Sequence, residues 1–342
     1  MIVKYQRNSN IELLRIIAMI FIVLLHIVVH ITGDVMPGAN MIKSVTIIGV
    51  DLFVMISGYF NIRLSFKSFF VLISVVLFYS VLSWISAYLV FDRPLNLGDI
   101  KNIFLPISVY GNYWFVSCYL MLMLLSPAIN VFLKNSSIVM YLGVLLVMAY
   151  ISCVSGWLFN SKINVNGYTT FNMIFMYMLG YCIHRFKFNE KFKSYIWILL
   201  YIVFTACIYF MTYIAPGRVF KYNNPIIILS TISLFCFFTS LHFSNKAVNV
   251  IASCMFPVYL IQEGFWGVLV YQYLKSNVLL SNPLELKCYG VLFGYAVCLF
   301  ILALIIEPIR KLIMTKPITL LATFIDEKYN IIRCKLTDKS LK

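Results

Sequence analysis

The sequence predicts an all-α protein, a polytopic transmembrane helical bundle of about ten spans with both termini in the cytoplasm. Of the 342 residues, 62% are hydrophobic and only 11% are charged, and the mean hydropathy is +0.92. A soluble domain of this size needs more charged surface. Runs of 18 or more apolar residues recur along the chain, and each can cross a bilayer core of about 30 Å as a helix.

These apolar runs place ten helices, in chain order at 11–32, 44–62, 69–91, 112–133, 138–158, 170–186, 195–214, 225–243, 248–274 and 287–314. The short apolar stretch 103–110 is expected to be a re-entrant or interfacial segment. Residues 1–314 then form one membrane domain, and the polar residues 315–342 form a short cytoplasmic tail.

Basic residues set the orientation, because the cytoplasmic loops of membrane proteins are enriched in Lys and Arg. With a cytoplasmic N-terminus, 18 basic residues fall on the cytoplasmic side and 8 on the other, leaving out Arg15 inside the first span. The formal charge of +15 is distributed between the spans, which favours membrane lipid over nucleic acid as a partner. We expect a multi-pass protein of the cytoplasmic (inner) membrane.

Four ionisable residues lie within the predicted spans, namely Arg15, His26, Asp51 and Glu263. Each costs at least ~2.5–3.5 kcal/mol on insertion scales, so each is a candidate functional residue. Arg15 and His26 are eleven residues apart, which is three helical turns plus roughly 20°, so they share one helix face about 16 Å apart in depth. Alternatively, His26 makes a helix-packing hydrogen bond and Arg15 snorkels to the cytoplasmic surface.

Asp51 is the expected partner of His26. Each lies six or seven residues below the outer end of its helix, so the two side chains should be at similar depth on sequential helices. A carboxylate beside an imidazole orients it as a general base and stabilises its cation. The alternative for Asp51 is an ion pair with a lysine such as Lys43.

The helix at 248–274 carries Gln262 and Glu263 close to mid-depth, after an expected kink at Pro257. Consecutive helix positions diverge by about 100°, so at most one of the two should point into a shared cavity. The alternative is that both hold helices together. Tyr113 and Trp114 open the helix at 112–133, where an interfacial aromatic belt is the ordinary interpretation.

Arg63 and Lys67 follow the second helix on its cytoplasmic side and are neighbours on one face if that helix continues. Together with Arg15 they would make a cationic rim suited to phosphate groups. The enrichment of cytoplasmic loops in basic residues also accounts for both without any function.

A bound metal is not expected. His26 and His30 have a spacing that can bind a metal, but no carboxylate or further histidine accompanies them on the same helix, unlike an HExxH zinc site. The nine cysteines include no CxxC pair.

Several of these segments together resemble the acyltransferase 3 family of integral membrane acyltransferases. The Arg15-x10-His26 stripe with Glu12 before it resembles the family's first helix, and GVDLFVMISGYF resembles its second. YWFVSCYLMLMLLSPAIN resembles its Trp-Phe helix that ends in proline. MYMLGYCIHRF and FPVYLIQEGF fall where its Gly-Tyr and Tyr-Leu-Ile helices would fall. The chain departs from the family at Gln262, where the family often has a histidine.

The resemblance implies an enzyme that transfers an acyl group, usually acetyl from acetyl-CoA, to a sugar hydroxyl of a cell-envelope glycan. On this interpretation acyl-CoA is a co-substrate and no cofactor is bound. The acceptor is an envelope polysaccharide or a lipid-linked oligosaccharide. His26 and Asp51 would be catalytic, Arg15, Arg63 and Lys67 would bind the donor, and Tyr113, Trp114, Gln262 and Glu263 would line the acceptor cavity.

Two mechanisms remain open for such an enzyme, direct transfer with both substrates bound and a transient acyl enzyme on His26. Two other functions also fit the polar residues. One is a transporter or flippase for a glycan or lipid-linked sugar, which should need charges along a complete path. The other is a non-catalytic partner of the polysaccharide assembly machinery, which the Gln262 departure favours.

The orientation gives the first testable prediction. Reporters fused after Lys134 and at Lys342 should read cytoplasmic, and a reporter in the 160–169 loop should read external, because the basic residues are distributed in that way. Reporter fusions in intact cells measure this directly. An external C-terminus would mean an odd number of spans and would remove the depth argument for His26 and Asp51.

Overall fold

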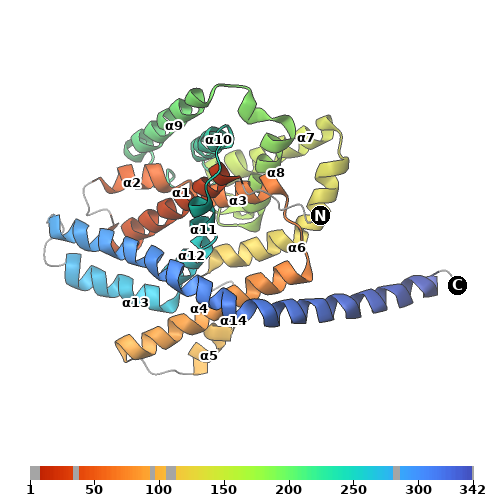
Figure 1. The fold of residues 1–342 in the computed structure, drawn as a ribbon. Helices are drawn as coiled ribbons and strands as arrows, with labels where there is room; N and C mark the ends of the chain where they lie inside the picture. The colour runs from red at the N-terminus through yellow and green to blue at the C-terminus, as the bar shows by residue number, and fades with distance from the viewer. Residues whose placement is uncertain (1–7, 34–37, 93–96, 105–112, 280–285, 341–342) are drawn as a thin grey trace.

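The computed structural model describes residues 8–33, 38–92, 97–104, 113–279 and 286–340, and these are helical apart from the loops that join the helices. The predicted all-α fold is confirmed (Figure 1). The first half contains α1 (Ser9–His26), α2 (Ala39–Thr46), α3 (Gly49–Phe60), α4 (Phe66–Phe91), α5 (Leu97–Phe104), α6 (Trp114–Asn135) and α7 (Ile138–Ala149). The second half contains α8 (Thr170–Phe186), α9 (Ser194–Ile214), α10 (Pro225–Thr239), α11 (Lys246–Ala252), α12 (Met255–Glu263), α13 (Phe265–Leu274) and α14 (Leu286–Ser340). Most of the predicted stretch 103–110 lies outside the described residues.

Helices occur at all ten predicted positions, although not all are full spans. Within the described residues, seven helices are long and apolar enough to cross a membrane, and the bent pair Lys246–Glu263 and Phe265–Asn277 makes eight if it is one span. Of the other two, α8 has 17 residues and α10 has 15. The chain is therefore a multi-pass membrane protein, and the count of ten spans and the orientation remain predictions.

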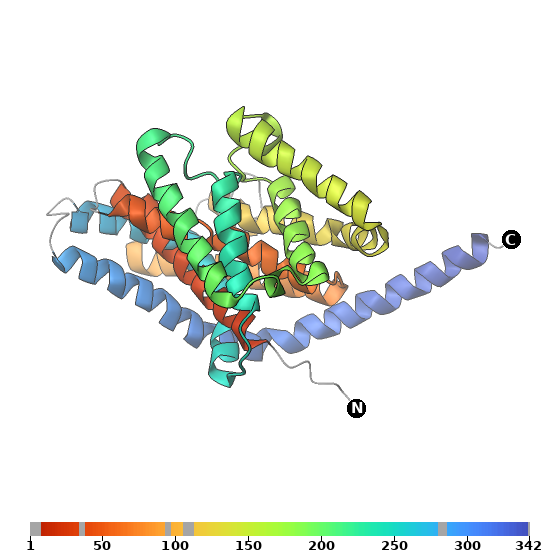
Figure 2. The ribbon, with the colours of Figure 1, turned by 90° about the horizontal axis from the view of Figure 1, so that it is seen from above.

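The expected polar tail is a continuation of the last helix. α14 runs from Leu286 to Ser340 over 55 residues, with Pro308 and Pro317 inside it. Its C-terminal part extends away from the other helices in both views (Figures 1 and 2). Residues 315–340 are thus helical. The first of them still contact the bundle, because Ile318 and Ala322 are buried and Asp326 lines a cavity with Leu64 and Leu124.

α1 occupies the middle of the bundle (Figure 2), where it packs against α2, α3, α10, α11 and α12. Its apolar residues Ile11, Leu14, Ala18 and Met19 are almost fully buried. Ordinary α-helical hydrogen bonding ends at His26, and a π-helical segment, Ile27–Thr32, follows. Such π-helical turns are rare and are frequent at functional sites.

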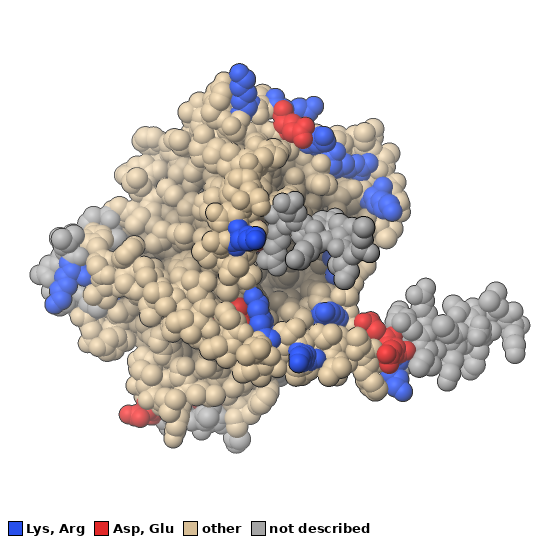
Figure 3. Space-filling model, viewed as in Figure 1, with Lys and Arg blue, Asp and Glu red and all other residues tan. Residues whose placement is uncertain are grey.

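The outside of the bundle is apolar. Many large hydrophobic side chains are more than half exposed, among them Leu89, Val139, Leu146, Ile214 and Leu312. Most of the face in Figure 3 is uncharged, and Lys and Arg side chains are more common there than Asp and Glu. This is the surface expected of helices that face lipid.

The close crossing of α3 and α8 places the loop that follows α3. A Cβ at Gly58 would overlap the backbone of Tyr177, so the absence of a side chain lets the two helices approach closely. The backbone N–H of Ile62 donates to the Tyr177 hydroxyl at 2.9 Å, and Asn130 Nδ2 donates to the Ile62 carbonyl at 2.8 Å. Both backbone groups of Ile62 are therefore held, which fixes the residue that precedes Arg63.

Candidate functional site

The carboxylate beside His26 is that of Glu263. Nδ1 of His26 lies 3.0 Å from Oε1 of Glu263, an ion-pair distance. The same carboxylate oxygen accepts a hydrogen bond from the Tyr271 hydroxyl at 3.0 Å. Both side chains of the pair are about nine-tenths buried. The side chain of Gln262 also lies within hydrogen-bond reach of the His26 ring.

A break in the helix places Glu263 opposite His26. Glu263 is the last residue of α12, and the chain bends by 63° at Gly264 before α13 begins. A Cβ at Gly264 would lie 2.7 Å from Ser83 Oγ, and Ser83 Oγ accepts the Trp266 backbone N–H at 2.7 Å. Irregular backbone at membrane depth is tolerated where protein surrounds it and satisfies it. The bend expected at Pro257 is therefore at Gly264 instead, and Pro257 lies in the first turn of α12.

The predicted pairing of His26 with Asp51 is wrong. Asp51 is 2% exposed, it makes no ion pair among the described residues, and its Oδ2 has no hydrogen-bond partner there. The alternative pairing with Lys43 is also absent, and the Lys43 ammonium lies 5.2 Å from the Phe220 ring centre. Asp51 lies in the first turn of α3, where the helix dipole favours a negative charge.

Asp51 lies near Tyr168 and Tyr222, which form an aromatic group with Trp114. Trp114 packs edge-on against Tyr168 at 4.7 Å between ring centres, and Tyr168 packs against Tyr222 at 4.9 Å. Burial raises the pKa of the Tyr222 phenol, and the nearby Tyr168 phenol and Asp51 carboxylate raise this pKa further. The unpaired carboxylate therefore lies close to the loop tyrosines that pack on Trp114.

A small cavity adjoins His26, and we call it the His26 chamber. Its volume is about 20 Å³, which holds roughly one or two water-sized groups. It is lined by Met19, Ile22, His26, Val50, Phe53, Trp114, Phe115, Phe256 and Tyr259.

A second cavity contains the two arginines proposed to bind the donor, and we call it the arginine-lined cavity. Its volume is about 370 Å³. It is lined by Arg15, Ile56, Ser57, Phe60, Asn61, Ile62, Arg63, Ser68, Val71, Leu72, Val75, Tyr119, Met123 and Phe256. Arg15 also lies 3.4 Å from Glu12, and Oδ1 of Asn61 is buried without a hydrogen-bond partner among the described residues.

Phe256 lines both cavities. On α12 it shares a face with Tyr259 and Glu263, since these positions are three and seven residues further on. That face meets α1, where Arg15, Met19, Ile22 and His26 share a face in the same way. Phe256 is thus the one residue that the linings of the arginine-lined cavity and the His26 chamber have in common.

Lys67 does not join Arg63 on one helix face. α3 ends at Phe60, and Asn61 has a positive φ of 57°. A capping box formed by Ser65 and Ser68 then begins α4. Arg63 lies in the loop between these helices and lines the arginine-lined cavity, whereas Lys67 is not among the residues that line it. The condition under which Arg63 and Lys67 would share a face, a second helix that continues through Lys67, is therefore not met.

The remaining predicted residues connect helices. The Tyr113 hydroxyl donates to the Leu260 carbonyl at 2.9 Å, which joins the start of α6 to α12. Gln262 is fully buried and its Nε2 donates to the Val23 carbonyl of α1 at 3.2 Å. Both residues hold α12 in place beside the site, while Trp114 lines the His26 chamber.

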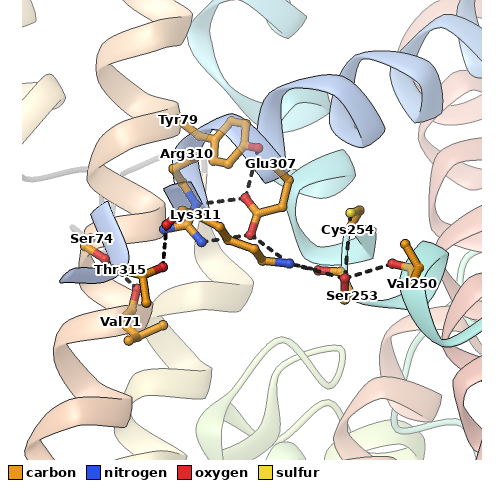
Figure 4. Close-up of polar contacts among 10 residues, drawn as sticks. All are labelled: Val71, Ser74, Tyr79, Val250, Ser253, Cys254, Glu307, Arg310, Lys311 and Thr315. Carbon is orange, nitrogen blue, oxygen red and sulfur yellow. Dashed lines mark hydrogen bonds and ion pairs between the residues drawn. The ribbon is translucent and has the colours of Figure 1, made fainter. Parts of the chain in front are cut away.

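Charged residues at the other end of α12 also hold it (Figure 4). Arg310 donates twice to Glu307 at 2.8 Å, and the Tyr79 hydroxyl of α4 donates to the same carboxylate at 3.2 Å. Lys311 lies 3.5 Å from Glu307 and donates to the carbonyl and the hydroxyl of Ser253 at 3.3 and 3.2 Å. Ser253 lies in the turn between α11 and α12, so this network fixes the start of α12 against α4 and α14.

One group of side chains has the composition of a metal site. The nearest ligand atoms of His26, His30 and Glu263 all lie within 4.8 Å of one another. His26 and His30 have no nearby carboxylate on their own helix, and the third residue of the group, Glu263, comes from α12. The His30 ring is stacked on Tyr271 at 5.1 Å between centres, and Tyr271 also bonds Glu263.

Comparison with known proteins gives one match. The model of a protein family described as an acyltransferase domain matches residues 8–309, which include every residue of the two cavities. No curated protein and no solved structure matches the chain.

We expect the purified protein to hold no stoichiometric transition metal. The Glu263 oxygen that would bind the ion already faces His26 and accepts the Tyr271 hydroxyl, and a metal would have to displace both contacts. Elemental analysis of protein purified without chelator measures this. One equivalent of zinc that disappears in Glu263→Ala would contradict it.

Proposed function

Because the chain belongs to the acyltransferase 3 family, we propose that this membrane acyltransferase moves an acetyl group from cytoplasmic acetyl-CoA to a sugar hydroxyl of a cell-envelope polysaccharide or its lipid-linked precursor. The observation that carries the proposal is the pair of cavities on one face of α1. One contains Arg15 and Arg63, the other contains His26, and Phe256 lines both.

The arginine-lined cavity suits the phosphates of the donor. A guanidinium is always charged and binds phosphate through two parallel hydrogen bonds. Arg63 is exposed, the backbone of the preceding Ile62 is held by Tyr177 and Asn130, and the Arg63 carbonyl accepts a hydrogen bond from the Ser68 hydroxyl at 3.3 Å. The side chain can therefore reach a ligand from a held backbone. A cytoplasmic donor reaches this cavity first on the predicted orientation.

The thioester of the donor would reach His26 by displacing the Phe256 ring. Arg15 and His26 are separated by about 16 Å along α1, and the pantetheine arm would cover this distance. The His26 chamber has a volume of about 20 Å³, and its walls are mainly apolar. A long acyl chain does not fit a space of this size, which supports acetyl as the acyl group.

His26 and Glu263 would act together as the base. Nε2 of His26 takes the proton of the sugar hydroxyl while the hydroxyl oxygen forms a bond to the thioester carbon. The carbon–sulfur bond then breaks, and the thiolate takes the proton from His26 as CoA leaves. Glu263 stabilises the imidazolium that forms between these steps, because its carboxylate lies 3.0 Å from Nδ1.

The aromatic group beside Asp51 supports a sugar as the acceptor. Sites for small polar molecules combine aromatic surfaces with a few polar groups that fix orientation. Trp114, which lines the His26 chamber, and Tyr168, which is about half exposed and packs on it, can supply such surfaces, and the unpaired Oδ2 of Asp51 is an acceptor for a hydroxyl. In this role Asp51 binds the acceptor and does not orient His26.

Glycan acetylation tests the proposed reaction and the role of His26. Complementing a deletion strain with the wild-type chain should restore O-acetyl groups on the envelope glycan. His26→Ala should lower transfer by about 100-fold or more, because it removes the general base. Glu263→Gln should also lower it, and by more than Asp51→Asn, since Glu263 contacts His26. The measurement is acetyl content per glycan at matched protein levels.

His184→Ala is the matched control, since this imidazole packs on Tyr59 outside the chamber. It should keep transfer close to the wild-type level. Full acetylation with His26→Ala would exclude the base, and a smaller loss with Glu263→Gln than with Asp51→Asn would contradict the role of Glu263 as the group that stabilises the His26 imidazolium. A wild-type chain that restores no acetyl group would exclude the proposed reaction.

Donor binding gives a second prediction. Of the neighbouring cations Arg63 and Lys67, only Arg63 lines the arginine-lined cavity, so the prediction concerns Arg63. Arg63→Ala should raise the acetyl-CoA concentration needed for half-maximal rate by about 10- to 150-fold, because a charge-assisted contact contributes roughly 1.5–3 kcal/mol. Lys67→Ala, the matched control outside the cavity, should change it little. Kinetics in membrane vesicles at fixed acceptor measure both. Equal effects of the two variants, or none, would move the donor site away from the arginine-lined cavity.

A further inference from the structure

The phenol of Tyr259 is a buried polar group whose proton has no acceptor among the described residues. The residue is 4% exposed, its hydroxyl makes no hydrogen bond of good geometry there, and the backbone N–H of Phe115 lies within reach of its oxygen. Leaving a buried hydroxyl unpaired is costly, so such groups are rare and those that occur need an explanation. Two other buried tyrosines are paired, Tyr113 with the Leu260 carbonyl and Tyr141 with the Met178 carbonyl, whereas the Tyr295 hydroxyl, which lines neither cavity, also has no partner among the described residues.

Tyr259 lines the His26 chamber. It lies on α12 four residues before Glu263, so the two side chains share one helix face about one turn apart. Its ring centre is 5.8 Å from that of Phe115 and 6.0 Å from that of Tyr113. Both neighbours lie at the amino end of α6, where the first backbone N–H groups have no helical partner and the dipole favours negative charge.

α12 is held on several sides around this tyrosine. Leu260 accepts the Tyr113 hydroxyl, and Gln262 donates to the Val23 carbonyl of α1. The turn before the helix is bound by Lys311, which the Glu307–Arg310 pair holds in turn (Figure 4). The phenol is therefore fixed in position before any ligand enters, which is the condition for efficient stabilisation of a developing charge.

We propose that the Tyr259 hydroxyl donates a hydrogen bond to the carbonyl oxygen of the thioester as this oxygen becomes negative during acyl transfer. The inference rests on the proposed function. When the sugar oxygen bonds to the carbonyl carbon, the carbonyl π electrons move to its oxygen. They return when the carbon–sulfur bond breaks and the thiolate leaves. His26 carries the proton between hydroxyl and thiolate throughout, so Tyr259 donates a hydrogen bond and keeps its own proton.

Tyr259→Phe isolates this role because it removes only the hydroxyl. The expected result is a fall in kcat of about 100- to 1,000-fold, the range for loss of one such donor. The half-saturating concentrations of acetyl-CoA and of the acceptor should stay within about threefold, because the contact is made in the transition state. The melting temperature of the detergent-solubilised protein should be unchanged or higher, since the variant removes an unpaired buried hydroxyl.

Tyr141→Phe is the matched control. Its hydroxyl donates to the Met178 carbonyl at 2.7 Å, between α7 and α8 and outside both cavities. This variant should show the opposite pattern, a lower melting temperature and an unchanged kcat per folded molecule.

The outcomes separate this inference from the function on which it rests. If wild-type protein transfers acetyl and folded Tyr259→Phe keeps its kcat within threefold, Tyr259 is not the donor and the proposed function stands. A wild-type protein that transfers no acetyl group would contradict both the role of Tyr259 and the proposed function. Should Tyr259→Phe fail to fold, 3-fluorotyrosine at position 259 gives a stronger donor of nearly the same shape. An equal or higher kcat then supports the inference, and a large decrease contradicts it.

Discussion

The contact between His26 and Glu263 is the constraint to which the rest of the site conforms. Two ionisable side chains within a membrane each cost several kilocalories per mole unless they are paired or facing water. Their pairing needs a carboxylate at the level of His26, which α12 provides by ending at Glu263. A continuous helix would carry the chain on past α1. The 63° bend at Gly264 turns it away instead, and Ser83 accepts one of the backbone N–H groups beyond the break.

Such a break would leave α12 short and poorly held, and much of the remaining polar chemistry compensates for this. Tyr113 at the start of α6 binds Leu260 of α12. Gln262 of α12 binds Val23 of α1, and Lys311 of α14 binds Ser253 in the turn before α12. The Glu307–Arg310 pair that supports Lys311 is itself almost fully buried. A buried ion pair adds little net stability compared with apolar residues of the same shape. Its contribution here is to fix one geometry, which brings Phe256, Tyr259 and Glu263 against α1.

The sequence predicted the helices and the face of α1 because both depend on local periodicity. The apolar runs predicted the ten helix positions, and the eleven-residue spacing predicted that Arg15 and His26 share one face of the first helix. The partner of His26 could not be found in this way, since the depth estimate assumed continuous helices and the break at Gly264 is a tertiary feature. Lys67 was misplaced for a related reason, although Ser65 and Ser68 in the sequence already had the spacing of a capping box. Phe256 and Tyr259 were missed because an aromatic residue in an apolar helix has no signal of its own.

Separation of the two cavities matters as much as their contents. An enzyme that uses a donor from one side of a membrane and an acceptor from the other needs a route for one acyl group and a barrier to everything else. On the proposed mechanism, the Phe256 ring that both cavities share would meet both needs, by filling the space when the arm is absent and moving aside when the arm enters. Arg15 lines one cavity and His26 the other, on one helix face. On the proposed mechanism, energy from phosphate binding at Arg63 would drive displacement of the Phe256 ring, since binding made away from the reacting atoms can offset the cost of distortion near them. The phosphate contacts at the arginines and the reacting thioester at His26 are then about 16 Å apart, the separation of Arg15 and His26 along α1.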